Sequence, residues 1–264
     1  MILKRPSEVE IMSKAADINR EALEAVAANI RPGVSTQELN QIAEDAILSR
    51  GAKPAFKGLY DYPKTLITSI NEVVVHGIPS NRKLSAGDIV SVDIGTFYKG
   101  YAADMAKTYP VGNISKDAAR LLRVTQESFY VGLEQAQVGN RLGDVSAAIQ
   151  AYVEKTGYWI VREFVGHGIG TKFHEGPEVP NFGKAGTGPV LREGLVLAIE
   201  PMVTESKTTV KIKDDGWTAV TTNGSLASHY EHTVAITKAG PKILTKKGQP
   251  VYSLASVGGF SGKA

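Results

Sequence analysis

The sequence predicts an α+β protein made of two similar halves, each with a pair of helices followed by antiparallel strands. Three observations support this fold class. Amphipathic helix patterns occur as two pairs, apolar β-prone runs follow each pair, and one nearly constant offset superposes the two stretches. With 264 residues the chain is long enough to bury a substantial core.

Two helices are predicted near the N-terminus. Ser7-x-x-Glu10 has the pattern of a capping box, in which a hydroxyl and a carboxylate three residues later satisfy the first backbone N–H groups. Apolar residues at helical spacing then continue to Val26. Ser35-x-x-Glu38 repeats the capping pattern and predicts the start of a second amphipathic helix.

A β-hairpin is predicted over residues 91–108, which read SVDIGTFYKGYAADMAKT. Its two acidic residues, Asp93 and Asp104, are direct partners if the turn is at Tyr98-Lys99 and diagonal neighbours if it is at Lys99-Gly100. In both registers they share a face of the sheet. Because like charges repel, either solvent screens the pair or a shared cation compensates it.

The same order of elements begins again after Ser115. A long amphipathic helix reaches Leu133, the pattern breaks at Gly139, and a second helix is predicted from about residue 142 to residue 157. Four pairs of positions are 106 residues apart and three are 107 apart: Gly33/Gly139, Glu38/Asp144, Leu39/Val145 and Gly51/Gly157, then Leu84/Leu191, Gly87/Gly194 and Asp93/Glu200. An offset kept across helices and strands is difficult to obtain by chance.

We therefore expect one catalytic domain over residues 1–250, composed of pseudo-symmetric halves at about 1–112 and 113–250. The last residues, 251–264, are small and rich in Gly and Ser, and we expect a loosely held tail there.

The repeat places a carboxylate, Glu200, at the strand position that Asp93 has in the first half. Glu231 is expected to start the final strand, much as Asp104 starts the run AKTYPV. Four carboxylates, two from each half, would then meet between the halves. Because four partly buried negative charges repel strongly, the pattern favours two divalent cations, whose charge of +4 balances them.

A nitrogen ligand for such a centre is offered by His167 in the Gly-rich run GHGIG. The alternative for this run, a phosphate loop, is weak because the full GxGxxG pattern is absent. Oxygen ligands with one imidazole favour Mn²⁺, Fe²⁺ or Co²⁺, with Zn²⁺ as a further candidate. Two such ions lower the pKa of a shared water, so hydrolysis by hydroxide is the predicted reaction class.

Composition excludes several other classes. The chain has no cysteine, so disulfide scaffolds, zinc-thiolate sites and thiol nucleophiles are ruled out. Its net charge of +3 is small and is not concentrated in a basic block, which argues against a specific nucleic-acid partner. The N-terminal residues lack the apolar core of a signal peptide and no segment approaches a membrane span, so we expect a cytoplasmic protein that does not bind membranes.

Taken together, the motifs resemble those of the type I methionine aminopeptidases over nearly the whole chain to about residue 250. The resemblance rests on the ordered set of acidic and histidine residues and on five stretches: NEVVVHGIP, DIVSVDIG, VGHGIG, HEGPEVPN and LAIEPM. It implies the pita-bread fold, two pseudo-symmetric α/β halves with antiparallel sheet around a central dinuclear metal site. It also implies a metal-dependent aminopeptidase that removes the initiator methionine from nascent proteins.

The resemblance also implies roles for individual residues. Asp93 would chelate one ion, His167 and Glu200 would bind the other, and Asp104 and Glu231 would bridge them. Glu200 would in addition carry a proton as general base. The residues His76 and His174 match the two active-site histidines that are not metal ligands; the first would contact the substrate backbone and the second the scissile peptide group. His229 and His232 match no functional position, and we expect structural roles for both.

A narrow apolar slot for the methionine side chain is expected from the same alignment. Its walls would be Phe56, Leu59, Tyr62, Ile67, Phe173 and Trp217, with Met202 close by. Such a slot suits an unbranched, polarizable thioether. Many members of the family have Cys at the positions of Phe56 and Ile67 and Tyr at that of Leu59, so we expect a differently shaped pocket that cysteine-directed inhibitors do not block.

Two alternatives to this function remain open. One is a proline-specific aminopeptidase or prolidase-like hydrolase, which shares the five metal ligands but normally has a separate N-terminal domain. The first helix here starts within ten residues of Met1, so we expect no such domain. The other is a catalytically inactive relative that binds ribosomes or RNA. For the aminopeptidase itself we expect a monomer that acts on nascent peptides and associates transiently with the ribosome.

Overall fold

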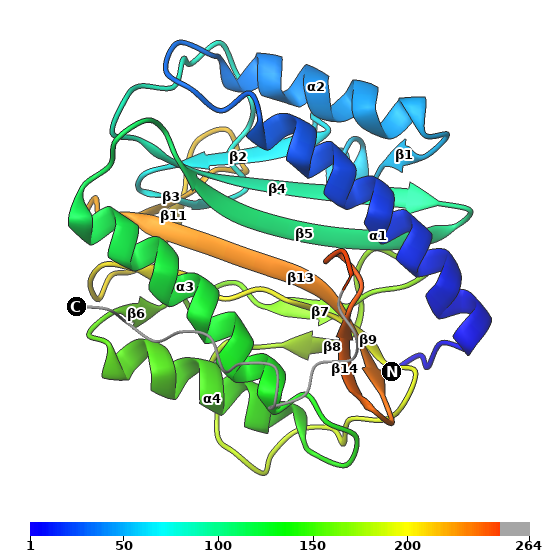
Figure 1. Cartoon of the computed structure of the whole chain (residues 1–264). Coiled ribbons are helices and arrows are strands. Elements are labelled where there is room, and N and C mark those ends of the chain that lie inside the picture. The colour runs from blue at the N-terminus through cyan, green and yellow to red at the C-terminus, as the bar shows by residue number, and fades with distance from the viewer. Residues whose placement is uncertain (249–264) are drawn as a thin grey trace.

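The computed structural model describes residues 1–248 and has the α+β architecture that the sequence predicts (Figure 1). Two pairs of helices lie on one side of a large, mostly antiparallel sheet. The helices are α1 (Pro6–Ala27), α2 (Thr36–Ser49), α3 (Lys116–Glu134) and α4 (Leu142–Lys155), with a short 3-10 turn, η1 (Leu59–Asp61). The expected tail at 251–264 lies outside the described residues, and the boundaries of the two halves remain a prediction.

The helix starts agree with the sequence pattern at α2 and differ from it at α1. At α2 the Ser35 hydroxyl accepts the Glu38 N–H at 3.2 Å and the Glu38 carboxylate accepts the Ser35 N–H at 2.8 Å, which confirms the predicted capping box. At α1 the cap is Arg5, whose N–H donates to Glu8 at 2.7 Å, so the box predicted at Ser7 is wrong. Pro6 explains the shift, because its fixed φ suits the first helical position.

The large sheet has a main path of seven strands in the order β1-β4-β5-β13-β9-β7-β8. These are β1 (Lys53–Pro54), β4 (Ile89–Tyr98), β5 (Tyr101–Pro110), β13 (Ala227–Thr237), β9 (Val196–Ile199), β7 (Gly166–Gly168) and β8 (Glu175–Val179). Four further strands join it: β2 (Leu66–Ile70), β6 (Trp159–Ile160), β10 (Met202–Thr204) and β14 (Gly240–Ile243). A separate small sheet contains β11 (Val210–Ile212), β12 (Ala219–Thr221) and β3 (Val73–Val75). Glu231 lies within β13, which β14 follows, so the expectation that Glu231 starts the final strand is wrong.

In the long strands, residues that pack against the helices alternate with residues that point to the opposite face of the sheet. On β4 the alternate residues Val92 and Ile94 pack with α1 and α2, and on β13 Tyr230 and Val234 pack with α3 and α4. Because successive side chains in a strand point to opposite faces, the residues between them point away from the helices. Asp93 is one of these intervening residues, so the helix-free face of the sheet is where the acidic residues gather.

The two halves repeat each other in backbone detail. Gly33 and Gly139 have φ of 90° and 94°, a conformation that favours glycine, and both end the loop before the second helix of their half. The Gly33 N–H donates to the carbonyl of Leu84 at 2.8 Å, and the Gly139 N–H donates to that of Leu191 at 3.0 Å. These equivalent bonds are the structural counterpart of the 106- and 107-residue offsets.

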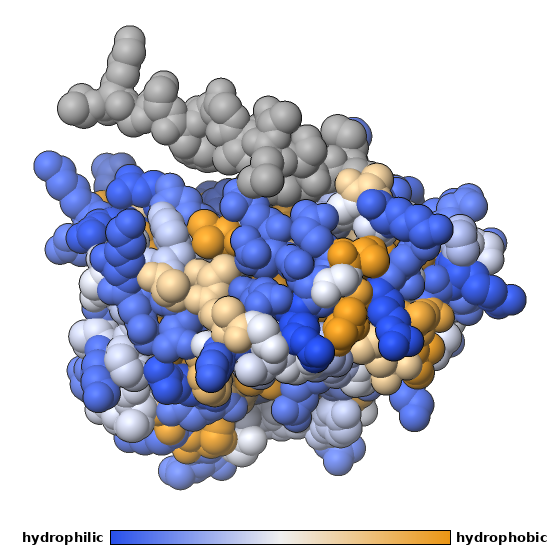
Figure 2. All heavy atoms as spheres, turned by 90° about the horizontal axis from the view of Figure 1, so that it is seen from below, coloured by the Kyte–Doolittle hydropathy of each residue, from blue (hydrophilic) through white to orange (hydrophobic). Residues whose placement is uncertain are grey.

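Polar residues cover most of the face seen from below, with apolar residues scattered between them (Figure 2). Within residues 1–248, none of the helices combines the length and the apolar character that crossing a bilayer requires.

Asn19 connects α1 to the strand that carries Asp93, and its loss should destabilise the protein. Its amide donates to the Ile94 carbonyl at 2.7 Å and accepts the Thr96 hydroxyl at 2.6 Å in a fully buried position. Asn19→Leu leaves both groups unsatisfied, so we expect about 2–4 kcal/mol lower stability in urea unfolding. Asn29→Ala, which removes only a local bond to Ala25, is the control. The double variant with Thr96→Val should recover part of the loss; an Asn19→Leu variant as stable as wild type would contradict this role.

Candidate metal centre and active site

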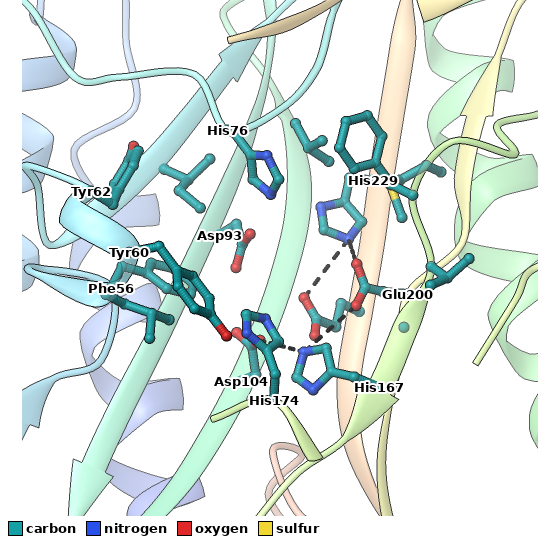
Figure 3. A pocket seen from close by; sticks show the side chains of 18 of the residues that line it. Phe56, Tyr60, Tyr62, His76, Asp93, Asp104, His167, His174, Glu200 and His229 are labelled. Atoms are coloured by element: carbon teal, nitrogen blue, oxygen red, sulfur yellow. Dashed lines mark ion pairs between the residues drawn. The ribbon is translucent and has the colours of Figure 1, made fainter. Parts of the chain in front are cut away.

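Five consecutive strands of the large sheet each bring one candidate ligand to the helix-free face. In the order of the sheet they are Asp93 on β4, Asp104 on β5, Glu231 on β13, Glu200 directly after β9, and His167 on β7. Neighbouring strands lie about 4.8 Å apart, so residues at one level of adjacent strands are close enough to share an ion. All five residues line a single cavity (Figure 3).

The register of the strands fixes how the acidic side chains meet. The hairpin turn is at Lys99-Gly100, with Tyr98 opposite Tyr101, so Asp93 and Asp104 are diagonal neighbours, the second of the two registers considered from the sequence. Asp93 lies opposite Ala106 on one side of β5, and Glu231 lies opposite Ala106 on the other side. The small Ala106 side chain thus separates two carboxylates, with Asp104 two residues along on the same face.

The cavity has a volume of about 500 Å³ and contains most of the residues predicted for the substrate slot. The predicted residues that line it are Phe56, Leu59, Tyr62, Ile67, His76, His174, Met202 and Trp217. Phe173 is a correction, because it is not part of the lining. Its buried ring packs behind the wall, edge-to-face with Phe56 at 5.3 Å and with His174 at 5.0 Å.

The carboxylates are buried without enough positive charge to balance them. Burial raises the pKa of Asp93 well above its ordinary value, and the charges of Asp104 and Glu200 raise it further. The pKa of Glu231 is raised in the same way, by burial first and then by its acidic neighbours. One buried oxygen on each of Asp93, Asp104 and Glu231 has no hydrogen-bond partner in the described part of the chain. Unpaired oxygens that converge in this way fit hard divalent cations.

His167 has its ring held in the orientation of a ligand. Its Nδ1 donates to the carbonyl of Gly168 at 2.9 Å, which leaves the Nε2 lone pair facing the cavity. Nε2 lies 3.7 Å from an oxygen of Asp104 and 3.8 Å from an oxygen of Glu200. Burial alone would lower the pKa of this imidazole, but the two carboxylates outweigh it and raise the pKa.

His76 and His174 lie at the cavity as neutral imidazoles. Burial lowers the pKa of each to about 4, helped by His229 in the first case and His167 in the second. His76 follows β3 with a φ of 61° and meets the rings of Phe164 and Trp217 edge-to-face. At neutral pH both rings can donate one hydrogen bond without adding charge to the site.

Tyr60 and His229 are among the cavity residues that were missed from the sequence. Tyr60 is 68% exposed, has a φ of 49°, and stacks on His174 with ring centroids 5.7 Å apart and planes 11° from parallel. His229 was expected to be structural but lines the cavity beside Glu200 and Glu231 (Figure 3). Its position two residues before Glu231 on one strand is the signal that could have revealed it. His232 points to the other face, where it bonds to Thr245 and Tyr230.

Comparisons with known proteins agree with this site. The sequence model of metallopeptidase family M24 matches residues 10–238. The methionine aminopeptidase of Clostridium perfringens is 53% identical over 93% of this chain and 98% of its own, and methionine aminopeptidase 1 of Bacillus subtilis is 49% identical over 93% and 99%. The crystal structure of methionine aminopeptidase from Thermotoga maritima superposes with a TM-score of 0.92 at 45% identity, covering 94% of this chain and all of that one. The prolidase from Pyrococcus furiosus superposes with a TM-score of 0.77 at 26% identity, but this chain covers 66% of it.

Divalent metal binding should release protons at neutral pH. Because the pKa values of Asp93 and Glu231 are raised, these carboxyls keep their protons to a higher pH than exposed carboxyls do, and a cation competes with those protons, so apparent affinity should rise with pH. We expect a net release of protons, measured by titrating Mn²⁺ into chelated protein calorimetrically in buffers of different ionisation enthalpy. Asp93→Asn should release fewer protons, and Asp214→Asn, on an exposed turn, should match wild type. Identical heats in all buffers would contradict the raised pKa values.

Proposed function

Because this chain belongs to metallopeptidase family M24, among the methionine aminopeptidases, we propose that it removes the N-terminal methionine from peptides by metal-dependent hydrolysis. The observation that carries the proposal is one cavity that joins five converging ligands, two neutral histidines and an apolar slot. The relatives named as methionine aminopeptidases are matched over nearly their whole length, whereas the prolidase is substantially longer than the matched region.

The residues that would hold two ions are Asp93, Asp104, His167, Glu200 and Glu231. Their oxygen-rich set supports Mn²⁺, Fe²⁺ or Co²⁺, with Zn²⁺ as a further candidate. When bound, two such ions supply hydroxide at neutral pH by lowering the pKa of a shared water. Glu200 would move a proton, a role supported by its half-buried carboxylate, which is less enclosed than those of Asp104 and Glu231.

His174 and His76 would act on the peptide group and the substrate backbone. A neutral imidazole N–H can donate to the carbonyl oxygen as negative charge develops on it, and such a donor contributes most in a site that excludes water. His174 is fixed between two other rings, stacked on Tyr60 and edge-to-face with His167 at 4.4 Å. This packing would keep the donor oriented while the substrate enters.

The apolar part of the cavity would hold the methionine side chain. Tyr62 is anchored by its hydroxyl, which donates to carbonyl groups of Leu66 and Gly77, both at 3.1 Å. Its ring meets Trp217 edge-to-face at 5.1 Å and Phe56 at 6.4 Å. A wall fixed in this way favours a long unbranched side chain over a β-branched one.

We also propose that the protein acts in the cytoplasm as a monomer on nascent chains. A chain without cysteine suits a reducing compartment. The small excess of positive charge, +3, supports weak and transient association with a polyanion such as the ribosome.

Peptide hydrolysis tests the function directly. Chelated protein should release methionine from a Met-Ala-Ser peptide only after Mn²⁺ or Co²⁺ is added, and should leave peptides that start with Leu or Ala-Pro intact. Cleavage of the Ala-Pro peptide would instead support a proline-specific hydrolase. If no peptide were cleaved with any metal, a binding role without catalysis would replace the proposal.

Removing the His174 imidazole should slow turnover without loss of metal. We expect His174→Ala to lower kcat about 10²–10³-fold, the range for deleting one hydrogen-bond donor to a developing oxyanion. Elemental analysis should find the same metal content as in wild type. Phe97→Leu, a change behind the wall against Phe173, is the control for altered packing. Loss of bound metal in His174→Ala would instead identify His174 as a ligand.

A further inference from the structure

His229 is a buried imidazole in the metal cavity that the five expected ligands leave without a role. It lies on β13, two residues before Glu231 and on the same face, and is 2% exposed. Its Nε2 points toward the carboxylates (Figure 3) and has no hydrogen-bond partner among residues 1–248. A buried polar nitrogen is normally paired, and an unpaired one directed into a cluster of carboxylates is suited to bind a cation.

The position of His229 matches that of the expected ligand His167. Nε2 of His229 is 3.6 Å from an oxygen of Glu200 and 3.7 Å from an oxygen of Glu231. Nε2 of His167 is 3.7 Å from Asp104 and 3.8 Å from Glu200. Glu200 therefore lies between the two imidazoles, with one oxygen toward each.

These distances suit atoms that share an ion better than atoms that share a proton. A hydrogen bond from an imidazole N–H to a carboxylate is about 2.7–3.2 Å long. Two ligands that each lie about 2.1 Å from one ion, at angles of about 90–120°, are roughly 3.0–3.6 Å apart. The separation of 3.7 Å between His229 and Glu231 is close to the second range and outside the first.

The ligand atoms fall into two groups that share one residue. Asp93, His229 and Glu231 offer atoms that all lie within 4.8 Å of one another, and so do Asp104, His167 and Glu231. Each group has one aspartate from the β4–β5 hairpin and one imidazole, and Glu231 belongs to both. We propose that His229 is a nitrogen ligand of the ion held by Asp93 and Glu231, so that each of the two ions binds one imidazole.

This assignment rests on the metal centre of the proposed function. It changes which divalent ions the site beside Asp93 is expected to prefer. An imidazole ligand raises affinity for Fe²⁺, Co²⁺ and Zn²⁺ relative to Mg²⁺, which prefers oxygen alone. The ion beside Asp93 would otherwise have only oxygen ligands from the protein. With His229 bound, the two positions have similar donor sets, so both should fill with Co²⁺ in a similar concentration range.

X-ray absorption of the protein loaded with two Co²⁺ ions measures bound imidazole directly, through scattering from the ring atoms. We expect two imidazoles per pair of ions in wild type and one in His229→Gln, which keeps a polar side chain of similar reach. Calorimetric titration of His229→Gln should show one site weakened by at least about tenfold, since even indirect metal partners contribute 10–100-fold. His232→Gln, on the same strand but the opposite face, should retain two imidazoles and both affinities.

The wild-type spectrum alone can overturn the assignment, whether or not the variants fold. One imidazole per pair of ions in wild type would show that His229 is not a ligand. Unchanged cobalt affinity at both sites in His229→Gln would do the same. Neither readout uses peptide cleavage, so failure of the proposed function, seen as metal binding without hydrolysis, is distinguishable from failure of this inference.

Discussion

The electrostatic balance of one buried cluster is the constraint on which the rest of the structure depends. Burial raises the pKa of Asp93 and Glu231 because the charged forms lose their hydration, and each added carboxylate increases the repulsion. No described Lys or Arg forms an ion pair with these residues. Divalent cations bound by this cluster would supply the positive charge that side chains do not, so the same residues that repel one another form the candidate metal centre.

The β-pleat allows this cluster to exist beside an ordinary hydrophobic core. On β4 and β13 every second residue packs against helices, as Ile94 and Val234 do, while Asp93 and Glu231 point to the opposite face. Asn19 shows how closely the two faces are connected, since it bonds to the backbone directly after Asp93 from the helix side. The same strands are therefore held by the helix pairs on one face and carry the candidate ligands on the other face.

Much of this organisation could be predicted from the sequence because it depends on local pattern. The offsets predicted the repeated halves, and strand alternation predicted that Asp93 and Asp104 share a face. The capping box at Ser7 failed for a local reason, the proline at position 6, whereas the predictions for Phe173 and His229 failed because of contacts with other segments of the chain. The depth of Phe173 behind the wall is set by packing against Phe56 and His174, and the contact of His229 with Glu200 joins two different strands. The burial of Phe173 has no signature in the local sequence, whereas the position of His229 two residues before Glu231 on one strand is such a signature.

Glycine at both sides of His167 explains why a strand of only three residues can carry a ligand. A Cβ at Gly166 would lie 2.3 Å from the carbonyl oxygen of Ala198 on β9, and a Cβ at Gly168 would lie 2.5 Å from that of Gly176 on β8. Both contacts are far below van der Waals distance and involve backbone, so a side chain at either position would push β7 away from its neighbours. The motif GHG thus keeps the backbone close on both sides while the one side chain between the glycines reaches the cavity. The distances of 3.7 and 3.8 Å from His167 to the carboxylates depend on that close approach.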